Sequence, residues 1–234
     1  MDTFTQGFSS AFTLIARFDP ELYGIAGLSL CVSCSATILA TAVTVPLAVF
    51  LGLHRFRGEE TFSRLTGALM SIPSVAVGLF AAMLFSRRGP FGGFNLLYTP
   101  AAMAIAQALL VSPLSFGLAY QLSRQRGREN SEAARTLGAS RLQTLRLVLR
   151  ELRPALAANL FIVFARAISE VGTVMIVGGN IRYQTRVLTT AIATSASMGD
   201  TGFAVALGLI LVTLALALSS AVSFFPKRDR EAAG

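Results

Sequence analysis

Apolar runs of about 20 residues recur along this chain, as expected for helices that cross a hydrocarbon core about 30 Å thick. Only 14% of the 234 residues are charged, whereas an ordinary soluble domain has about 25%. Closed membrane barrels need short strands of alternating polarity, and the sequence shows no such alternation. The sequence therefore predicts an all-α fold, a polytopic helical membrane protein.

Five transmembrane helices are expected from these runs. Their ranges are Tyr23–Leu53, Leu65–Phe85, Thr99–Tyr120, Ala155–Val177 and Gly202–Phe225. Residues 1–22 then form an N-terminal segment, in which residues 4–18 can form a short interfacial helix. Residues 23–226 form the transmembrane domain and residues 227–234 the tail.

The basic residues predict the orientation, because Lys and Arg are enriched in cytoplasmic loops. Three lie in segment 54–66, eight in segment 121–154 and three in the tail, against five on the opposite side and Arg166 within a span. We therefore expect the N-terminus outside and the C-terminus in the cytoplasm. This distribution between apolar runs also argues against a nucleic-acid partner.

Two residue types that often form metal or redox sites have simpler explanations here. Cys31 and Cys34 form a C-x-x-C inside an apolar run without a second ligand pair, so we expect small packing residues. His54 is the single histidine, which excludes a histidine-cluster metal site. No signal peptide is expected, because residues 1–22 lack a basic start followed by an apolar core.

The basic segment 129–153, which we call the knob, is predicted to form two short helices. Ser131 can cap a first helix that opens with Glu132, Gly138 allows a left-handed turn, and a second helix starts near Ser140. One stripe of the second helix is apolar: Leu142, Leu145, Val148, Leu149 and Leu152. From these residues alone, two interpretations of the knob are equally supported. It is either a surface hairpin that holds anionic lipid or a docking element for a soluble partner.

The stretch "EAARTLGASRLQTLRLVLRELRP", residues 132–154, resembles the cytoplasmic EAA loop of ABC importer permeases. That pattern is E-A-A, three residues, G, then about nine residues to an aliphatic position. The matching positions are Glu132, Ala133, Ala134, Gly138 and Val148. The family usually continues with leucine–proline, whereas this chain has Arg150-Glu151 and its proline at Pro154.

The resemblance extends over residues 28–225. The strings "SIPSVAVGLF" and "FARAISEVGTVMIVGGNI" are similar to the oxyanion branch of these permeases, which handles molybdate, tungstate and sulfate. The strings "SRRGPFG", "YTPAAMAIAQALLVSP" and "VGGNIRYQTRVLTTAI" resemble the tungstate-type permeases more than the other two. The resemblance thus implies the type I importer permease fold and tungstate as substrate, with molybdate or sulfate as the alternative.

The resemblance also implies the partners. Two copies would form a homodimer in the inner membrane, with surrounding lipid, and receive the oxyanion from an extracytoplasmic binding protein. Two cytoplasmic ABC ATPase subunits would dock on the knob. The coupling residues would be Glu132, Ala133, Ala134, Gly138, Arg141, Leu142 and Val148. ATP and Mg²⁺ would bind the partner, because this chain has no G-x-x-x-x-G-K-S/T stretch and no cofactor site of its own.

The fourth expected span carries two charges, Arg166 and Glu170, four residues apart and so on one helix face. Each would cost about 2.5–3.5 kcal/mol at a helix centre facing lipid, so we expect them to face a cavity or each other. A latch between the two halves of a dimer, a counter-charge for the substrate path and an ion pair inside one subunit all remain open. Wild-type transport by the charge-reversed pair would favour the internal ion pair.

Other polar residues are candidates for the translocation path or its gate. They are Pro73, Ser74, Gln107, Thr173 and Asn180. Pro73 frees a backbone carbonyl, and the others offer neutral donors to a tetrahedral dianion, although helix packing explains Pro73 equally well. Arg182 and Arg186 on the outer side either contact the binding protein or are solvated loop charges.

Two other classes of function fit the sequence less well. An intramembrane enzyme would need a nucleophile with its base, a carboxylate pair or a metal site, and the sequence offers no such set, so no catalytic residue is expected. A secondary transporter that works without an ATPase usually shows inverted repeats, and no clear internal repeat is present.

Overall fold

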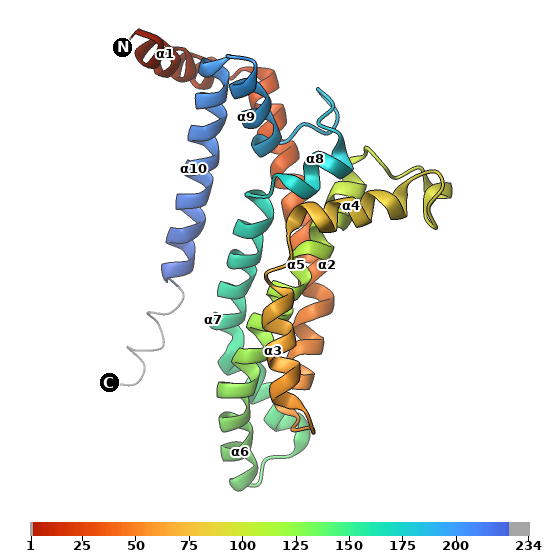
Figure 1. Ribbon diagram of the computed structural model, residues 1–234. Helices are drawn as coiled ribbons and strands as arrows, with labels where there is room; N and C mark the ends of the chain where they lie inside the picture. The colour runs from red at the N-terminus through yellow and green to blue at the C-terminus, as the bar shows by residue number, and fades with distance from the viewer. Residues whose placement is uncertain (1, 225–234) are drawn as a thin grey trace.

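The computed structural model describes residues 2–224, and every regular element in that part of the chain is helical (Figure 1). The all-α prediction is therefore confirmed. The elements are α1 Asp2–Ala16, α2 Pro20–Leu53, α3 Glu59–Leu69, α4 Ser74–Phe85, the short 3₁₀ turn η1 Gly92–Phe94, α5 Pro100–Leu122, the π-helical turn η2 Ser123–Gly127, α6 Arg128–Thr136, α7 Arg141–Ile168, α8 Gly172–Gly178, α9 Leu188–Ser197 and α10 Thr201–Phe224. The predicted tail, residues 227–234, lies outside the described residues.

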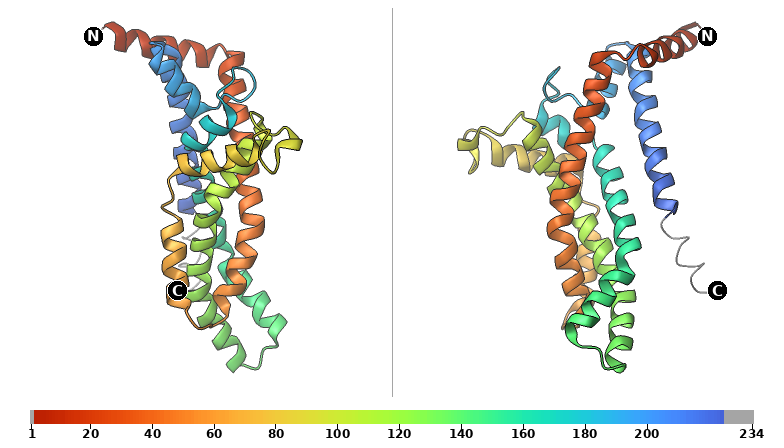
Figure 2. Two further views of the ribbon diagram at one scale, coloured as in Figure 1. Left: turned by 45° about the vertical axis from the view of Figure 1, so that its right-hand side comes forward. Right: turned by 180° about the vertical axis from the view of Figure 1, so that it is seen from behind.

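Two long helices, α2 and α5, pack side by side and form the axis of the molecule (Figures 1 and 2). Both begin in the same way. The side chain of Asp19 accepts a hydrogen bond from the Leu22 N–H, that of Thr99 accepts one from the Ala102 N–H, and a proline occupies the first helical position of each. Small buried residues on both helices allow close approach, as is usual between membrane helices.

The second expected span is not a continuous helix. It divides into α3 and α4, which meet at an angle of 86° across residues 70–73. Pro73 lies at the N-cap of α4 rather than inside a helix, because it has no N–H to donate to a preceding turn. The expected span over Leu65–Phe85 is therefore a bent pair of helices and not one straight helix.

The fourth expected span is also divided. Helices α7 and α8 meet at 58° across residues 169–171. At its other end α7 begins at Arg141, so the second helix of the knob and the fourth span form one helix that passes through Pro154. The expected start of the span at Ala155 therefore lies inside a longer helix.

By length and composition, α2 and the continuous helix Pro100–Thr136 can each cross a membrane, and each bent pair can supply a further crossing. Helix α10 corresponds to the fifth expected span, and Thr201–Ala217 is its apolar stretch among the described residues. Helix α1, which agrees with the short helix expected near residues 4–18, packs against the start of α10 (Figure 2). Helix α9 was not expected from the sequence.

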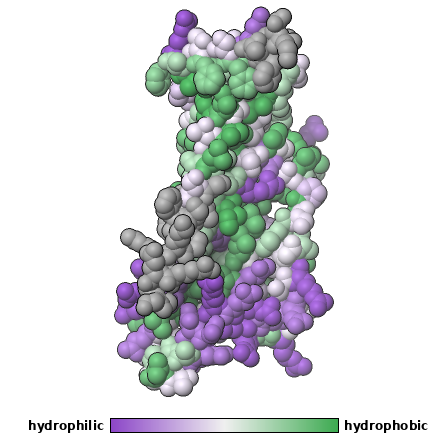
Figure 3. Space-filling model, turned by 90° about the vertical axis from the view of Figure 1, so that its left-hand side faces the viewer, coloured by the Kyte–Doolittle hydropathy of each residue, from purple (hydrophilic) through white to green (hydrophobic). Residues whose placement is uncertain are grey.

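The surface separates by polarity along the long axis. In Figure 3, apolar residues cover much of the middle, and hydrophilic residues gather toward the end that carries α6 and the start of α7. Cys31 and Cys34 lie on the exposed face of α2. They therefore do not pack in the core of the chain, contrary to the expectation from sequence.

Candidate functional site

The knob is the end of the molecule formed by α6, a tight turn and the start of α7 (Figure 1). Helix α6 does not start at Ser131, because it continues from α5 through η2 as one helix over Pro100–Thr136. Glu132 is accordingly an interior residue of that helix and not a first-turn residue. The predicted N-cap at Ser131 is wrong, because the continuous helix begins at Pro100 and the N–H groups that need a cap lie there.

The turn of the knob agrees with the sequence prediction. Gly138 has a φ of +82°, a conformation that glycine adopts without steric cost. Ser140 caps α7 in a capping box: its hydroxyl accepts from the Gln143 N–H, and the Gln143 side chain accepts from the Ser140 N–H at 2.8 Å. These two features fix where the chain reverses.

The predicted coupling residues divide into buried and exposed groups. Ala134 and Val148 are buried and hold α6 against α7, with exposed fractions of 4% and 0%. Ala133, Arg141, Leu142 and the side chain of Glu132 are exposed. The apolar stripe is only partly confirmed, since Leu152 is buried with Val148 but Leu142, Leu145 and Leu149 are exposed.

The knob is attached to the rest of the chain through Arg128, which is not among the residues predicted from the sequence. Its Nε donates to the Gly52 carbonyl at 2.7 Å and its Nη2 to the His54 carbonyl at 2.7 Å, so it satisfies carbonyls at the end of α2. Its Nη1 lies 2.8 Å from Oε1 of Glu59, whose carboxylate also receives Arg124 at 2.6 Å. Arg128 and Glu59 are mostly buried, so this cluster joins α6, α2 and α3.

The two breaks in the expected spans lie against each other, where α4 packs on α8 (Figure 2). We call this contact the junction. The Thr173 hydroxyl donates to the Ser74 carbonyl at 2.9 Å. A Cβ at Gly78 would lie 2.8 Å from the Cα of Thr173, so the helices approach as closely as glycine allows. From α5, the Gln107 side chain donates to the Ala167 carbonyl at 2.9 Å.

Arg166 and Glu170 form an ion pair in the chain, with 2.6 Å between Nη1 and Oε2. Glu170 is buried, and its Oε1 also accepts from the N–H groups of Gly172 and Thr173 at the start of α8. This second role changes the meaning of a charge reversal, because an arginine at position 170 cannot accept those two hydrogen bonds. Loss of function in the reversed pair would therefore not exclude an internal ion pair.

The remaining predicted residues lie apart from the junction. The side chain of Asn180 donates to the Thr194 hydroxyl at 2.6 Å. Arg182 forms a bidentate pair with Glu21, at 2.7 and 2.6 Å, and this carboxylate raises the pKa of Arg182. Arg186 is partly buried close by. The structure thus brings Ser74, Gln107, Arg166, Glu170 and Thr173 together and separates Asn180, Arg182 and Arg186 from them.

Comparison with known proteins agrees with this architecture. Residues 44–230 match the family described as the binding-protein-dependent transport system inner membrane component. The chain is 51% identical over 222 residues to a tungstate uptake system permease protein of Peptoclostridium acidaminophilum, covering 95% of this chain and 97% of the relative. It is 36% identical to a probable anion ABC transporter permease of Haloferax volcanii, covering 89% and 91%.

A more distant relative is a sulfate transport system permease of Salmonella typhimurium, 30% identical, with 90% of this chain and 78% of the relative covered. The family match spans most of the chain and includes the knob, α7 and the junction. The likeness to ABC importer permeases that was inferred from residues 132–154 is thereby confirmed. The chain belongs to the family of inner membrane components of binding-protein-dependent transport systems, and it is an integral membrane permease subunit of the ABC importer type.

Proposed function

We propose that this chain is the permease of an ATP-driven tungstate importer. The observation that carries the proposal is the 51% identity to the tungstate permease of P. acidaminophilum over nearly all of both chains. A permease of Campylobacter jejuni that is named for tungstate uptake, 32% identical, supports the same substrate. The likeness to sulfate permeases supports sulfate as the second candidate, and molybdate has the same charge and tetrahedral shape.

The knob lies in the cytoplasm and receives the ATPase subunit. The basic residues at this end support that orientation, which places the N-terminus outside and the C-terminus inside. The docking surface consists of exposed residues around the turn, above all Glu132, Leu137 and Leu142. Leu137 is 88% exposed, which a docked partner would cover.

Two copies of the chain form the working unit around a central path. The side chain of Arg166 is 42% exposed in the apolar part of the chain, and a charge facing lipid at a helix centre would cost about 2.5–3.5 kcal/mol. A water-lined path closed by the second copy removes this cost. Thr173 and Gln107 are engaged in bonds to backbone carbonyls, which supports a role in shaping the path behind Arg166.

In each cycle, closure of the two ATPase subunits moves the knobs, and the path opens alternately to the binding protein outside and to the cytoplasm. ATP and Mg²⁺ stay on the ATPase, and the oxyanion crosses without forming a covalent bond to the permease. The extracytoplasmic side that carries Arg182 and Arg186 receives the binding protein.

The test is uptake into proteoliposomes that contain the permease and its ATPase. Tungstate, molybdate or sulfate is supplied with the binding protein, and ATP hydrolysis and uptake are measured together. We expect tungstate to stimulate both. Stimulation by sulfate alone would favour the second candidate, and uptake without the ATPase would overturn the ATP-driven mechanism.

A pair of variants separates coupling from insertion. Glu132→Arg should abolish the stimulation of ATP hydrolysis while the protein still inserts normally. Glu60→Arg, a charge reversal of an exposed glutamate on α3, should leave it unchanged. Equal stimulation in both variants would remove the knob from the coupling mechanism.

A further inference from the structure

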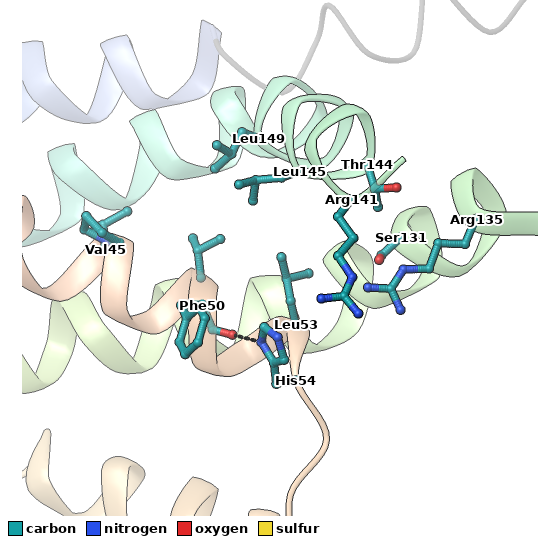
Figure 4. A pocket seen from close by; sticks show the side chains of 12 residues that line it. Val45, Phe50, Leu53, His54, Ser131, Arg135, Arg141, Thr144, Leu145 and Leu149 are labelled. Carbon is teal, nitrogen blue, oxygen red and sulfur yellow. Dashed lines mark hydrogen bonds between the residues drawn. The ribbon is translucent and has the colours of Figure 1, made fainter. Parts of the chain in front are cut away.

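A cavity of about 500 Å³ opens between the end of α2 and the first turns of α7 (Figure 4). Val45, Val49 and Leu53 of α2 line one wall, and Leu145 and Leu149 of α7 line the other. The cavity extends along about 13 Å of α2, from Val45 to His54, at 1.5 Å per helical residue. It is therefore long enough for part of an elongated ligand.

The polarity of the cavity changes from one end to the other. In Figure 4 the apolar side chains Val45 and Leu149 lie at one end, and Arg135, Arg141 and His54 lie at the other. Helices α2 and α7 run in opposite directions here, so the end of one and the start of the other meet beside the turn of the knob. The apolar end points away from the knob, toward the apolar middle of the molecule.

The two arginines at the polar end lie with their guanidinium groups near each other and near His54 (Figure 4). Arg55, Arg124 and Arg128 close by are each paired with a glutamate. Within residues 2–224, by contrast, Arg135 and Arg141 take part in no ion pair. Two adjacent positive charges at one mouth attract an anion, and an arginine fork matches phosphate geometry.

We propose that this cavity binds one anionic phospholipid, with its phosphate at Arg135 and Arg141 and part of an acyl chain between α2 and α7. A free inorganic anion would use the arginines and leave the apolar walls uncovered. An acidic side chain of a docked protein would also reach only the mouth. A lipid matches both ends, and basic pockets between membrane helices are known to hold anionic headgroups.

The site clamps the end of α2 to the first turns of α7, beside the turn of the knob. An occupied cavity therefore holds the knob in one position relative to α2. That this lipid comes from the cytoplasmic leaflet follows from the proposed orientation, whereas the binding geometry does not depend on it. The site can accordingly be tested without transport.

The test uses the purified full chain in a neutral detergent. Binding of dioleoylphosphatidylglycerol and of dioleoylphosphatidylcholine, which have the same acyl chains, is measured by native mass spectrometry. We expect phosphatidylglycerol to bind more tightly than phosphatidylcholine. The double variant Arg135→Gln/Arg141→Gln should weaken phosphatidylglycerol binding about 30-fold, since each basic residue near an anionic headgroup contributes about a fivefold change.

The matched control is Arg146→Gln/Arg150→Gln, which removes the same charge from exposed positions of α7 that do not line the cavity. It should bind phosphatidylglycerol as the unmodified chain does. An equal loss in both double variants would show a general charge effect and overturn the proposal. Equal binding of the two lipids by the unmodified chain would overturn it as well.

A second pair of variants tests the acyl chain and keeps all arginines. Leu149→Trp fills the apolar end and should weaken phosphatidylglycerol binding, whereas Leu147→Trp, outside the cavity, should not. Unchanged binding by Leu149→Trp would exclude entry of the acyl chain. Competition by glycerol phosphate at the same concentration as the lipid would identify a free-anion site instead.

Discussion

The junction and the knob are two regions of the same chain with opposite construction. At the junction, Thr173 and Glu170 are buried, and their polar groups are bonded within the chain. At the tip of the knob, Leu137 and Leu142 are exposed. The junction is therefore a buried internal contact that supports the fold, whereas the tip of the knob is an exposed surface that a partner can cover.

This difference predicts which measurement each region controls. Substitutions at the junction should lower the stability of the chain, because they break buried contacts. Substitutions at the knob should mainly change communication with the ATPase, because few buried contacts depend on the tip. The following variants test this division in order of decreasing effect.

Glu170→Ala should have the largest effect. It leaves Arg166 without its partner and the start of α8 without an acceptor, and we expect a loss of about 3 kcal/mol, at the low end for a buried ion pair because Arg166 is partly exposed. Thermal unfolding in detergent measures this loss of stability. Glu170→Gln should lose less, since it keeps an acceptor, and Glu151→Ala on the exposed side of α7 should change little. Equal stability of all three variants would contradict a supporting role for the junction.

Gly78→Val should have the next largest effect. Its Cβ would meet the Cα of Thr173 at 2.8 Å, which forces α4 away from α8, and overpacking of this kind costs about 2 kcal/mol. The matched control is Gly67→Val on α3, where a Cβ meets no atom within 4 Å. A lower unfolding temperature in both variants would point to helix propensity rather than packing.

Arg128→Gln tests the attachment of the knob. It removes the ion pair with Glu59 and the bonds to the carbonyls of Gly52 and His54. We expect the chain to lose about 1.5 kcal/mol of stability, the low end for hydrogen bonds of a charged group. Because the knob is then held less firmly, transport per ATP hydrolysed in the reconstituted complex should fall. Arg126→Gln, at an exposed position two residues away, is the control. An unchanged ratio of transport to hydrolysis would exclude Arg128 from the coupling route.

Gly138→Val should have the smallest effect on stability. Its surroundings are open, so the cost comes from the positive φ alone, which is about 1 kcal/mol for a residue with a side chain. Gly138→Asn should be tolerated better, since asparagine adopts this conformation more readily. Thermal unfolding in detergent measures this loss of stability, and ATP hydrolysis stimulated by the binding protein measures its effect on coupling. The turn geometry would be unimportant if valine and asparagine behaved alike.

The places of the helices were predictable from the sequence, whereas the breaks were not. A hydropathy window averages over about 20 residues, so residues 70–73 and 169–171 disappear between apolar neighbours on both sides. Local signals were present: Pro73 stands at the first break, and Glu170 is a charge inside the second. Neither signal alone distinguishes a bend from a divided helix.

The local geometry of the knob was predictable from the sequence because it depends on neighbouring residues, whereas its attachment depends on residues far apart in the chain. The turn at Gly138 and the cap at Ser140 depend on residues within four positions of each other. The bond from Arg128 to Glu59 joins residues 69 positions apart, and the pair of Arg182 with Glu21 joins residues 161 apart. The chain has many arginines, and a single sequence does not show which of them pairs with which distant glutamate.

The uninterrupted helix Pro100–Thr136 has a mechanical consequence. At 1.5 Å per residue this rod is about 55 Å long, and it reaches from the level of α4 and α8 to the turn beside the ATPase docking surface (Figure 1). A tilt of about 5° about one end would swing the other through about 5 Å, which is close to one helical pitch. A small rotation of the rod at the knob is therefore carried over its full length, to the level of α4 and α8.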